Sequence, residues 1–356
     1  MNILYLGHYR EKNSFGYASL RYIEALNNVA NVNLSIRPIY LTIDNYVTNL
    51  DKDLLSIENN KQYSYDCVIQ DTLPEFYEYN SRFGKNICVP KIATRNLSHT
   101  GWIEKINMMD EVWVNSFYGE KILRESGVFK KIKVIPEPFN LKRIDEEVNH
   151  SDENEFNFYS FSSLNHKDGL LELLIAYLSE FSNKESARLI IKIDSAEESL
   201  IKNIINNAYE ISRKTPKDTI EPIIILGHID HTKKVDLHNN CHCYIDTSKC
   251  SHGGAACVEA LLYGNSVICV DKTAPACYIT QNNGFNIKSV EENVMSNNIF
   301  GLNNIFTQHE TWYKPIISDI RTKMRSAFQL TKEEKQRKTS SIDRNIFDNS
   351  KFHAYL

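Results

Sequence analysis

The sequence predicts an α/β protein built from two doubly wound, Rossmann-like domains. Two observations indicate this fold class. Short apolar strands alternate with amphipathic helices, and the series occurs twice along the 356 residues, as expected for parallel sheets made of βαβ units. Between the two series, residues 141–155 are polar and rich in charge, which is typical of a linker. We therefore expect an N-terminal domain at 1–140, a linker at 141–155, a second domain at 156–327 and closing helices at 328–356.

The first series contains five predicted strands and two prominent predicted helices. Apolar residues at helical spacing cover Tyr17–Asn27 and Phe117–Ser126. Ser116 is suited to cap the second of these helices, and Gly127 is suited to end it. The predicted strands are Asn2–Leu6, Asp66–Gln70, Lys91–Thr94, Glu111–Asn115 and Lys133–Ile135.

The second series repeats this order and closes with amphipathic helices. Helices are predicted at Leu170–Phe181, from Glu197 onward, from about Trp312 to Leu330 and after Lys332. Two doubly wound domains bind ligands beyond the carboxyl ends of their strands, so we expect a ligand cleft between them. The predicted strands are FNFYSF from Phe156, RLIIKID, PIIILG, CYIDTS, SVICV and Gly284–Ile287.

Composition and charge narrow the function classes. The formal net charge is -4, so the chain has no general basic field, which argues against a nucleic-acid partner. No stretch reaches the roughly 18 uninterrupted apolar residues of a membrane-spanning helix. The N-terminal MNILYLGHY lacks the basic and apolar regions of a signal peptide. A cytoplasmic protein is therefore expected.

The cysteines and acidic pairs do not predict a metal site. The eight cysteines include no CxxC pair, and no HxxxH pair completes a tetrahedral zinc set. Buried thiols in a reducing compartment are the expectation. The only DxD motif, at Asp51 and Asp53, lies in a polar stretch and is expected on the surface. No metal and no cofactor are predicted.

The most informative segment runs from Lys249 to Val270, where a glycine pair precedes an almost wholly apolar helix. Glu259 is the one charge in that helix, and a buried carboxylate without a partner costs several kcal/mol. Its partner is either a neighbouring Lys or Arg or a hydroxyl group of a ligand. Gly253 and Gly254 favour the ligand, because they let backbone approach it and leave N–H groups exposed at a helix start. A nucleotide would satisfy both features.

Other loops that follow strands contribute candidate ligand contacts. Ser14 and Gly16 precede the first helix, where either a plain turn or a phosphate site would fit. The loop SSLNHKDG after the strand at Phe156 contains Lys167, which is either a solvated surface lysine or a ligand for a diphosphate. Lys249 lies just before the glycine pair and is positioned to act with it. The absence of a full GxGxxG motif argues against a nicotinamide dehydrogenase.

Four stretches together resemble retaining glycosyltransferases of the GT-B fold, in family 4, or group 1. SKCSHGGAACVEALLYGNSVI is similar to the family's donor-binding signature, SSLNHKDG resembles its diphosphate loop, and the segment from Thr100 together with AYLSEF and IIKID is similar to one subgroup. The resemblance implies that Glu259 binds the ribose of a nucleotide and that Lys167 binds the diphosphate. Ser251 stands where the family has its first Glu, and Phe161 and Ser162 stand where it has an arginine.

The same resemblance implies roles for residues in both domains. In the acceptor-side first domain, it makes His99 the candidate that reaches the donor sugar, and a plain surface histidine is the alternative. From their places in loops that follow strands, Arg95 is expected to add positive charge to the cleft and Asp71 to contact the acceptor. Residues 328–356 would form helices that cross back onto that domain. His99, Lys167 and Glu259 are the implied catalytic residues. The implied donor-binding residues are Gly16, Ser163, Lys167, Lys249, Ser251, His252, Gly253, Gly254, Ala255 and Glu259.

The implied activity is transfer of a sugar from a nucleoside diphosphate, UDP or GDP, to an acceptor hydroxyl, with retention and without a metal. The acceptor would be a glycan, a lipid-linked glycan or a protein, and peripheral contact with a membrane is compatible with it. Ser251 and the missing arginine leave an alternative open, a catalytically weak relative that binds a nucleotide or glycan as a partner subunit. Glu259, Lys167 and the intact glycine turn favour the enzyme.

Overall fold

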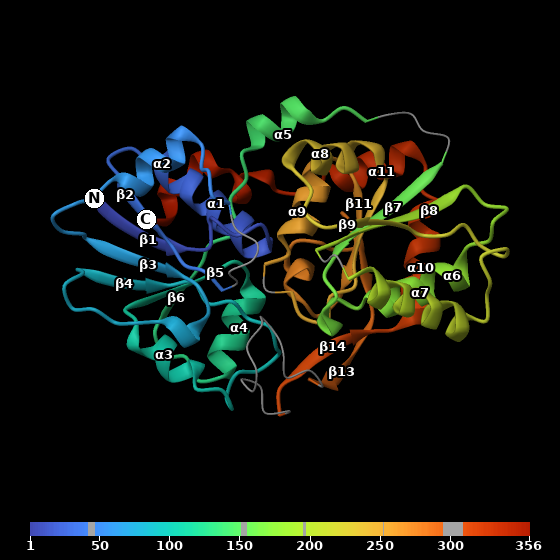
Figure 1. Ribbon diagram of the computed structural model, residues 1–356, viewed down its shortest axis with the longest axis horizontal. Coiled ribbons are helices and arrows are strands. Elements are labelled where there is room, and N and C mark those ends of the chain that lie inside the picture. The colour runs from blue at the N-terminus through green and yellow to red at the C-terminus, as the bar shows by residue number, and fades with distance from the viewer. Residues whose placement is uncertain (42–46, 151–154, 195–196, 252, 295–308) are drawn as a thin grey trace. The chain divides into compact units, whose positions relative to one another are not determined.

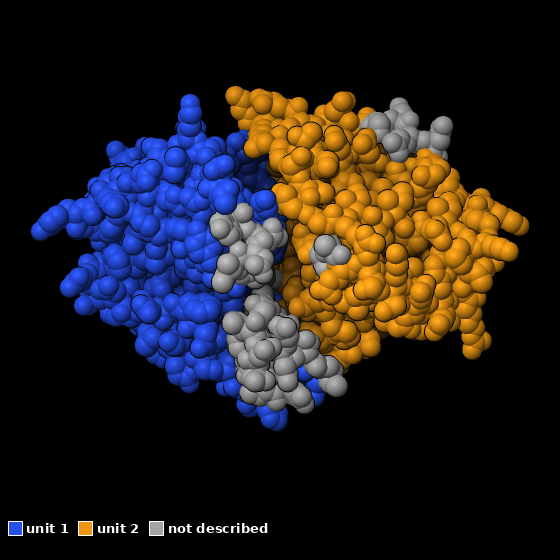
Figure 2. Space-filling model, in the orientation of Figure 1, with its two compact units in different colours: residues 1–141, 293–311, 344–356 blue, residues 142–292, 312–343 orange. Residues whose placement is uncertain are grey.

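The computed structural model describes residues 1–41, 47–150, 155–194, 197–251, 253–294 and 309–356. Contacts divide the chain into two compact units, drawn in Figure 2. Unit 1 comprises Met1–Leu141, Asn293–Thr311 and Arg344–Leu356. Unit 2 comprises Lys142–Glu292 and Trp312–Asp343.

Unit 1 is a parallel sheet of six strands in the order β2-β1-β3-β4-β5-β6 (Figure 1). Helices α1 and α2 pack on one face with the C-terminal 3₁₀ helix η5, and α3 and α4 cover the other face. The core between sheet and helices buries apolar side chains such as Ile3, Tyr22 and Trp113. The elements are β1 Asn2–Gly7, α1 Ser14–Asn27, β2 Asn33–Pro38, α2 Lys52–Asn59, β3 Cys67–Asp71, η1 Pro74–Phe76, β4 Lys85–Cys88, α3 Trp102–Met108, β5 Glu111–Val114, α4 Phe117–Glu125, β6 Lys131–Val134, η4 Arg344–Phe347 and η5 Asn349–Tyr355.

Unit 2 holds a second parallel sheet of six strands, in the order β12-β11-β10-β7-β8-β9, and the short pair β13-β14. Helices α6, α7 and α10 form the main core on one face, and α8, α9 and α11 lie on the other (Figure 1). The elements are β7 Phe156–Ser162, η2 His166–Asp168, α6 Leu170–Glu180, β8 Ala187–Ile193, α7 Glu198–Ser212, β9 Ile223–Leu226, α8 His231–Asn240, β10 Cys243–Asp246, α9 Ala255–Leu262, β11 Ser266–Val270, η3 Ala274–Cys277, β12 Phe285–Ile287, β13 Ser289–Asn293, β14 Thr311–Pro315, α10 Ile317–Phe328 and α11 Lys332–Thr339.

The predicted α/β class with two Rossmann-like sheets is confirmed, two local predictions are wrong, and one strand was missed. Residues 91–94 form no strand, because the strand of that region is β4 and Pro90 follows it. Strand β2 was not predicted. The predicted helix at 312–330 begins only at Ile317, since residues 311–315 pair as β14 with β13.

Helix boundaries agree with the predicted caps where a polar side chain does the capping. Ser116 accepts a hydrogen bond from the Gly119 amide at the start of α4, and Gly127 follows its end with φ of 103°. Helix α1 begins three residues earlier than predicted, because Asn13 caps it by accepting from Phe15 and Gly16. A further helix, α5, covers Leu141–Glu147 within the stretch predicted as a linker.

Candidate functional site

The carboxyl edge of the unit 2 sheet gathers most of the predicted donor-binding residues. The chain starts this sheet at β7, adds β8 and β9 on one side, and then adds β10, β11 and β12 on the other. The direction of strand addition therefore reverses between β7 and β10, and doubly wound sheets bind ligands at that point. The loop after β7 carries Ser163 and Lys167, and the loop after β10 carries Lys249 and the glycine pair.

Hydrogen bonds fasten these two loops to each other. The Lys249 amide donates to the Lys167 carbonyl at 2.7 Å. The Thr247 hydroxyl donates to the Asp168 carbonyl at 3.0 Å and to the Gly169 carbonyl at 3.1 Å. Gly169 has φ of 67°, and a Cβ there would lie 2.4 Å from the Thr247 carbonyl oxygen. The structure thus brings together two loops that are about 80 residues apart in sequence, as their adjacent strands require.

Lys167 is a half-buried cation held by its neighbour. Its Nζ lies 2.7 Å from Oδ1 of Asp168, and 24 % of its side chain is exposed. Burial opposes the charge, but the field and hydrogen bond of Asp168, with Cys250 and Asp246 adding to them, raise the pKa of Lys167 above its ordinary value. Ser163 donates from its amide to Asp168 Oδ2 at 2.7 Å. Lys167 is therefore a protonated donor at neutral pH, restrained by a carboxylate.

The glycine turn, Gly253 and Gly254, directly precedes helix α9. The Ser251 carbonyl accepts a hydrogen bond from the Ala274 amide at 3.1 Å. Gly254 has φ of 69°, and a Cβ there would lie 2.8 Å from the Cα atom of Pro275. The glycine is therefore required by its backbone conformation and by its packing on η3. Gly253 is buried, Ala255 is half-buried, and predicted residue His252 lies outside the described residues.

Replacing Gly254 with alanine is expected to destabilise unit 2 more than replacing Gly227 with alanine. Both glycines have positive φ, 69° and 75°, but only Gly254 has neighbours within 4 Å of the added Cβ. Holding an alanine in this left-handed backbone conformation costs about 1–2 kcal/mol at either position. Urea unfolding measures both variants, and equal losses would show that the contact with Pro275 relaxes without cost.

Glu259 has a protein partner in the structure. Its side chain is 8 % exposed, and Lys234 of α8 donates to Oε1 at 2.6 Å. The prediction that this buried carboxylate needs a partner is thereby confirmed. The partner seen is the basic residue of the two alternatives that the sequence left open.

Lys249 lies deeper than its predicted contact with a diphosphate requires. Its side chain is 0 % exposed, and its Nζ lies 3.1 Å from Oε1 of Glu172 and 3.2 Å from Oε2 of Glu292. It also lies 3.3 Å from Nδ1 of His166 and 5.3 Å from the centre of the Trp312 ring. The structure therefore surrounds Lys249 with protein groups.

The predicted residues of unit 1 lie in separate environments. His99 is exposed, and its ring centre is 4.9 Å from that of His309. Arg95 is half-buried and pairs with Oε2 of Glu125 at 2.8 Å. Gly16 lies in the first turn of α1, where its amide donates to the Asn13 side chain. A Cβ at Gly16 would collide with the Glu11 carbonyl, so close packing accounts for this glycine.

Asp71 belongs to the core of unit 1. It is 0 % exposed, pairs with Lys91, and accepts hydrogen bonds from the hydroxyls of Tyr5 at 2.6 Å and Ser19 at 2.7 Å. These interactions are all internal to unit 1. Contact of Asp71 with an acceptor stays a prediction, whereas its structural role is visible.

Two lysines near the predicted donor segment were not identified from sequence. Lys234 precedes Glu259 by 25 residues, and nothing in the spacing marks it. Lys272 lies two residues after the end of β11 and is exposed, with its Nζ 5.5 Å from the centre of the Tyr313 ring. Its place after a strand of the same sheet, next to β10, is the signal that would have identified it.

Other predicted features have structural explanations. Asp51 of the DxD motif caps α2 by accepting from the Leu54 amide at 2.8 Å. All eight cysteines are thiols, and seven of them are buried as the sequence predicted, whereas Cys277 is exposed. Among the described residues, none of the helices has the length and hydropathy needed to cross a membrane.

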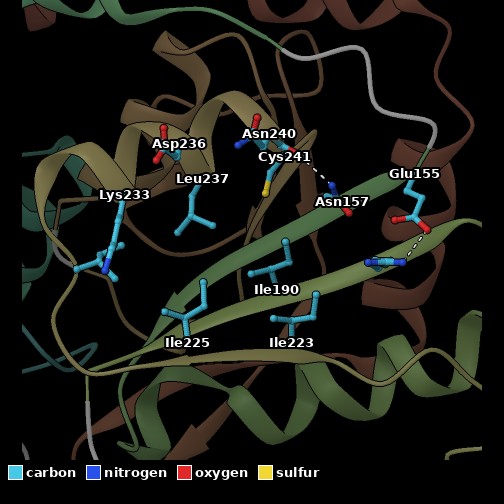
Figure 3. A pocket seen from close by; sticks show the side chains of 12 residues that line it. Glu155, Asn157, Ile190, Ile223, Ile225, Lys233, Asp236, Leu237, Asn240 and Cys241 are labelled. Atoms are coloured by element: carbon cyan, nitrogen blue, oxygen red, sulfur yellow. Dashed lines mark hydrogen bonds and ion pairs between the residues drawn. The ribbon is translucent and has the colours of Figure 1, made fainter.

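A cavity of about 360 Å³ lies elsewhere in unit 2 (Figure 3). Its floor consists of Ile190, Ile223 and Ile225 from β8 and β9, and Lys233 and Leu237 of α8 line another side. Several lining residues come from the first halves of their strands, away from the carboxyl edge. None of the predicted donor-binding residues lines this cavity.

Comparisons with known proteins identify the fold. No family model matches the chain, and no curated protein matches it in sequence. Solved structures do match over the whole chain. One is described as trehalose-6-phosphate from E. coli bound with UDP-2-fluoro glucose, with a TM-score of 0.67, 9% identity and coverage of 100% of this chain and 98% of that chain.

Two further solved structures agree with this match. Anabaena Alr3699/HepE in complex with UDP and glucose gives a TM-score of 0.64 at 14% identity, covering 100% of this chain and 98% of that one. A glycosyltransferase from Rickettsia africae ESF-5 gives a TM-score of 0.65 at 12% identity, covering 99% of this chain and 96% of that one. The chain therefore has the GT-B fold of glycosyltransferases, as its sequence predicted.

Proposed function

We propose that this protein is a glycosyltransferase that moves a sugar from a nucleoside-diphosphate-sugar to an acceptor hydroxyl. The observation that carries the proposal is the pair of fastened loops at the carboxyl edge of the unit 2 sheet, in a chain with the GT-B fold. UDP is the first donor nucleotide to test, because two of the similar structures were solved with UDP ligands. The sugar acceptor is proposed to be a glycan, a lipid-linked glycan or a protein.

The donor roles are assigned by chemistry. Glu259 would accept hydrogen bonds from the ribose hydroxyls, as the resemblance implies, while it pairs with Lys234. Lys167 would bind the diphosphate, together with N–H groups at the start of α9. Ser251 offers a hydroxyl instead of a carboxylate at the position that resembles the family's first Glu. The exposed Lys272 would supply a second cation from the loop after β11, at the same edge of the sheet.

The reaction breaks the bond between the anomeric carbon and the diphosphate oxygen and forms a new glycosidic bond to the acceptor oxygen. Negative charge grows on the departing diphosphate, and a preorganised cation such as Lys167 stabilises it. The leaving phosphate would accept the proton of the acceptor hydroxyl, and we propose that the anomeric configuration is retained and that no metal is needed. His99 is proposed to contact the donor sugar, on the strength of the resemblance.

The two domains would bind different substrates. We propose that residues 1–140 provide the acceptor side, with the half-buried Arg95, and that residues 156–327 bind the nucleotide-sugar. Residues 141–155 would join these domains, and 328–356 would return to the first. The finding that Arg344–Leu356 belongs to unit 1 supports this return.

Binding of UDP is expected to stabilise the protein and to depend on Lys167. At a free ligand concentration of about 100 times Kd, the gain is about 2.7 kcal/mol. Thermal unfolding with UDP, GDP, ADP and CMP identifies the nucleotide, and Lys167→Met is expected to weaken binding of the diphosphate by about tenfold, the loss of a charged hydrogen bond. Lys202→Met, an exposed lysine on α7, is the matched control. Absence of stabilisation by every nucleotide would refute the donor site.

Turnover is measured separately, because nucleotide binding alone does not show transfer. The nucleotide that stabilises the protein is supplied as its sugar conjugate, and release of the nucleoside diphosphate is followed in the presence of sugar acceptors. Magnetic resonance of the product's anomeric proton then tests retention. Activity that disappears with a chelator and returns with a divalent metal would contradict the metal-independent mechanism.

A further inference from the structure

We propose that Lys249 is a positioning residue, whose buried ammonium holds the diphosphate loop and the glycine turn in their binding arrangement. This inference rests on the proposed function of that site and assigns Lys249 a different role from direct contact with the donor. The ammonium of a lysine has three hydrogens to donate. Three acceptors lie within 3.3 Å of Nζ, namely Glu172 Oε1, Glu292 Oε2 and His166 Nδ1. The protein itself therefore surrounds the Lys249 ammonium with two hydrogen-bond partners, Glu292 and His166, and with an ion-pair partner, Glu172.

The backbone of Lys249 is fixed as firmly as its side chain. Its amide donates to the Lys167 carbonyl at 2.7 Å, and its carbonyl accepts from the Tyr313 amide at 2.8 Å. Lys249 thus joins the loop after β7 to strand β14, while its ammonium adds α6 through Glu172 and β13 through Glu292. Four elements of unit 2 meet at one residue, two positions before Ser251.

The charges around Lys249 are balanced. Glu292 also accepts hydrogen bonds from the Trp312 indole at 3.0 Å and from Lys314 at 3.1 Å. Burial raises the pKa of Glu292, but Lys249, Lys314 and Trp312 outweigh it and lower this pKa overall. Burial and the charge of Lys249 lower the pKa of His166, which keeps its ring neutral at pH 7. The cluster therefore consists of two ammonium groups and two carboxylates.

This balance decides between positioning and direct contact. A diphosphate would have to displace Glu172 and Glu292 from an ammonium that is 0 % exposed. Breaking a buried pair leaves a carboxylate without its partner, which is strongly unfavourable. Lys167, by contrast, keeps 24 % of its side chain exposed and is attached to Lys249 through the backbone. Lys249 therefore acts on the donor through Lys167.

The first test needs no ligand. In Lys249→Met, the backbone amides of residue 249 and of Tyr313 are expected to exchange hydrogen at least about tenfold faster than in the parent protein, because the loops open locally. Lys314→Met is the matched control, since Lys314 binds the same Glu292 but is 42 % exposed. Unchanged exchange in Lys249→Met would overturn the positioning role, whether or not the protein binds nucleotides.

The second test separates the two roles by the sign of an effect. If Lys249 positions the loop, Glu292→Gln weakens the interaction that holds the Lys249 ammonium and lowers UDP affinity by severalfold. If Lys249 binds the diphosphate directly, Glu292→Gln releases its ammonium and raises UDP affinity, which would overturn the proposal. Glu172→Gln gives the same comparison if one variant does not fold.

A double-mutant cycle completes the argument. Positioning predicts that Lys167→Met costs far less UDP affinity in a Lys249→Met background than alone, because the loop is already displaced. Additive losses from the two substitutions would overturn the proposal. If the parent protein binds no nucleotide, the proposed function fails while the hydrogen-exchange result still decides the role of Lys249.

Discussion

Replacing Asp71 with asparagine is expected to lower the free energy of unfolding by about 3–5 kcal/mol, the cost of breaking a buried ion pair. Asp71 and Lys91 have side chains 0 % and 1 % exposed, so water cannot replace the lost partner. The substitution leaves the Lys91 ammonium in the core of unit 1 without its counter-charge. It also weakens the acceptor for the hydroxyls of Tyr5 and Ser19.

The pH dependence of stability provides an independent check on Asp71. Burial raises the pKa of Asp71. The charge and hydrogen bond of Lys91, together with the hydrogen bonds from Tyr5 and Ser19, outweigh burial and lower this pKa overall. A carboxyl whose pKa is lower in the folded than in the unfolded state stabilises the fold above its ordinary pKa of about 3.9. That contribution is lost as the pH falls below this value. Asp71→Asn should therefore show a smaller loss of stability on acidification than the parent protein.

Urea unfolding at neutral pH and at a series of acidic pH values measures both effects. Lys131→Met is the control, because Lys131 is 68 % exposed at 3.5 Å from Glu111 and an exposed pair contributes at most about 1 kcal/mol. An Asp71→Asn variant that keeps its stability would contradict the structural role. If such a variant also had a changed KM for the acceptor, the acceptor contact predicted from sequence would gain support.

The order of strands and helices could be predicted because apolar periodicity is a local signal. Strands such as β1, β5 and β7 are short apolar runs, and Ser116 with Gly127 marks both ends of α4. The failures occurred where context decides. Residues 311–315 adopt a strand only because β13 pairs with them, and a helical period continues past them in the sequence.

The site was only partly predictable, for a related reason. A lone carboxylate in an apolar helix needs a partner, and that requirement is visible in the sequence around Glu259. The identity of Lys234 is not visible, since the contact depends on how α8 packs beside α9. Lys249 illustrates the converse. The sequence shows that Lys249 lies beside the glycine turn. It does not show that Lys249 is buried against carboxylates, because these come from α6 and β13.

Replacing Glu259 with glutamine is expected to reduce the stabilisation by UDP and to destabilise the protein on its own. A ribose-binding carboxylate supplies charged acceptors, and hydrogen bonds to charged groups contribute about 1.5–3 kcal/mol each. The loss therefore corresponds to about ten- to a hundredfold in affinity. The Lys234 ammonium, 15 % exposed, also loses its counter-charge at 2.6 Å. Calorimetric titration with UDP and thermal unfolding without it measure the two losses separately.

A second pair of variants separates these two causes. Lys234→Met removes the same ion pair but leaves the Glu259 carboxylate in place, so it should destabilise the protein while retaining part of its UDP affinity. In Glu259→Leu with Lys234→Met, an apolar pair replaces a largely buried ion pair, which is often neutral for stability. If Glu259 binds ribose, this double variant regains stability but still fails to bind UDP. If it binds UDP normally, Glu259 has a structural role only, and the nucleotide is held by the loops that carry Lys167 and Gly254.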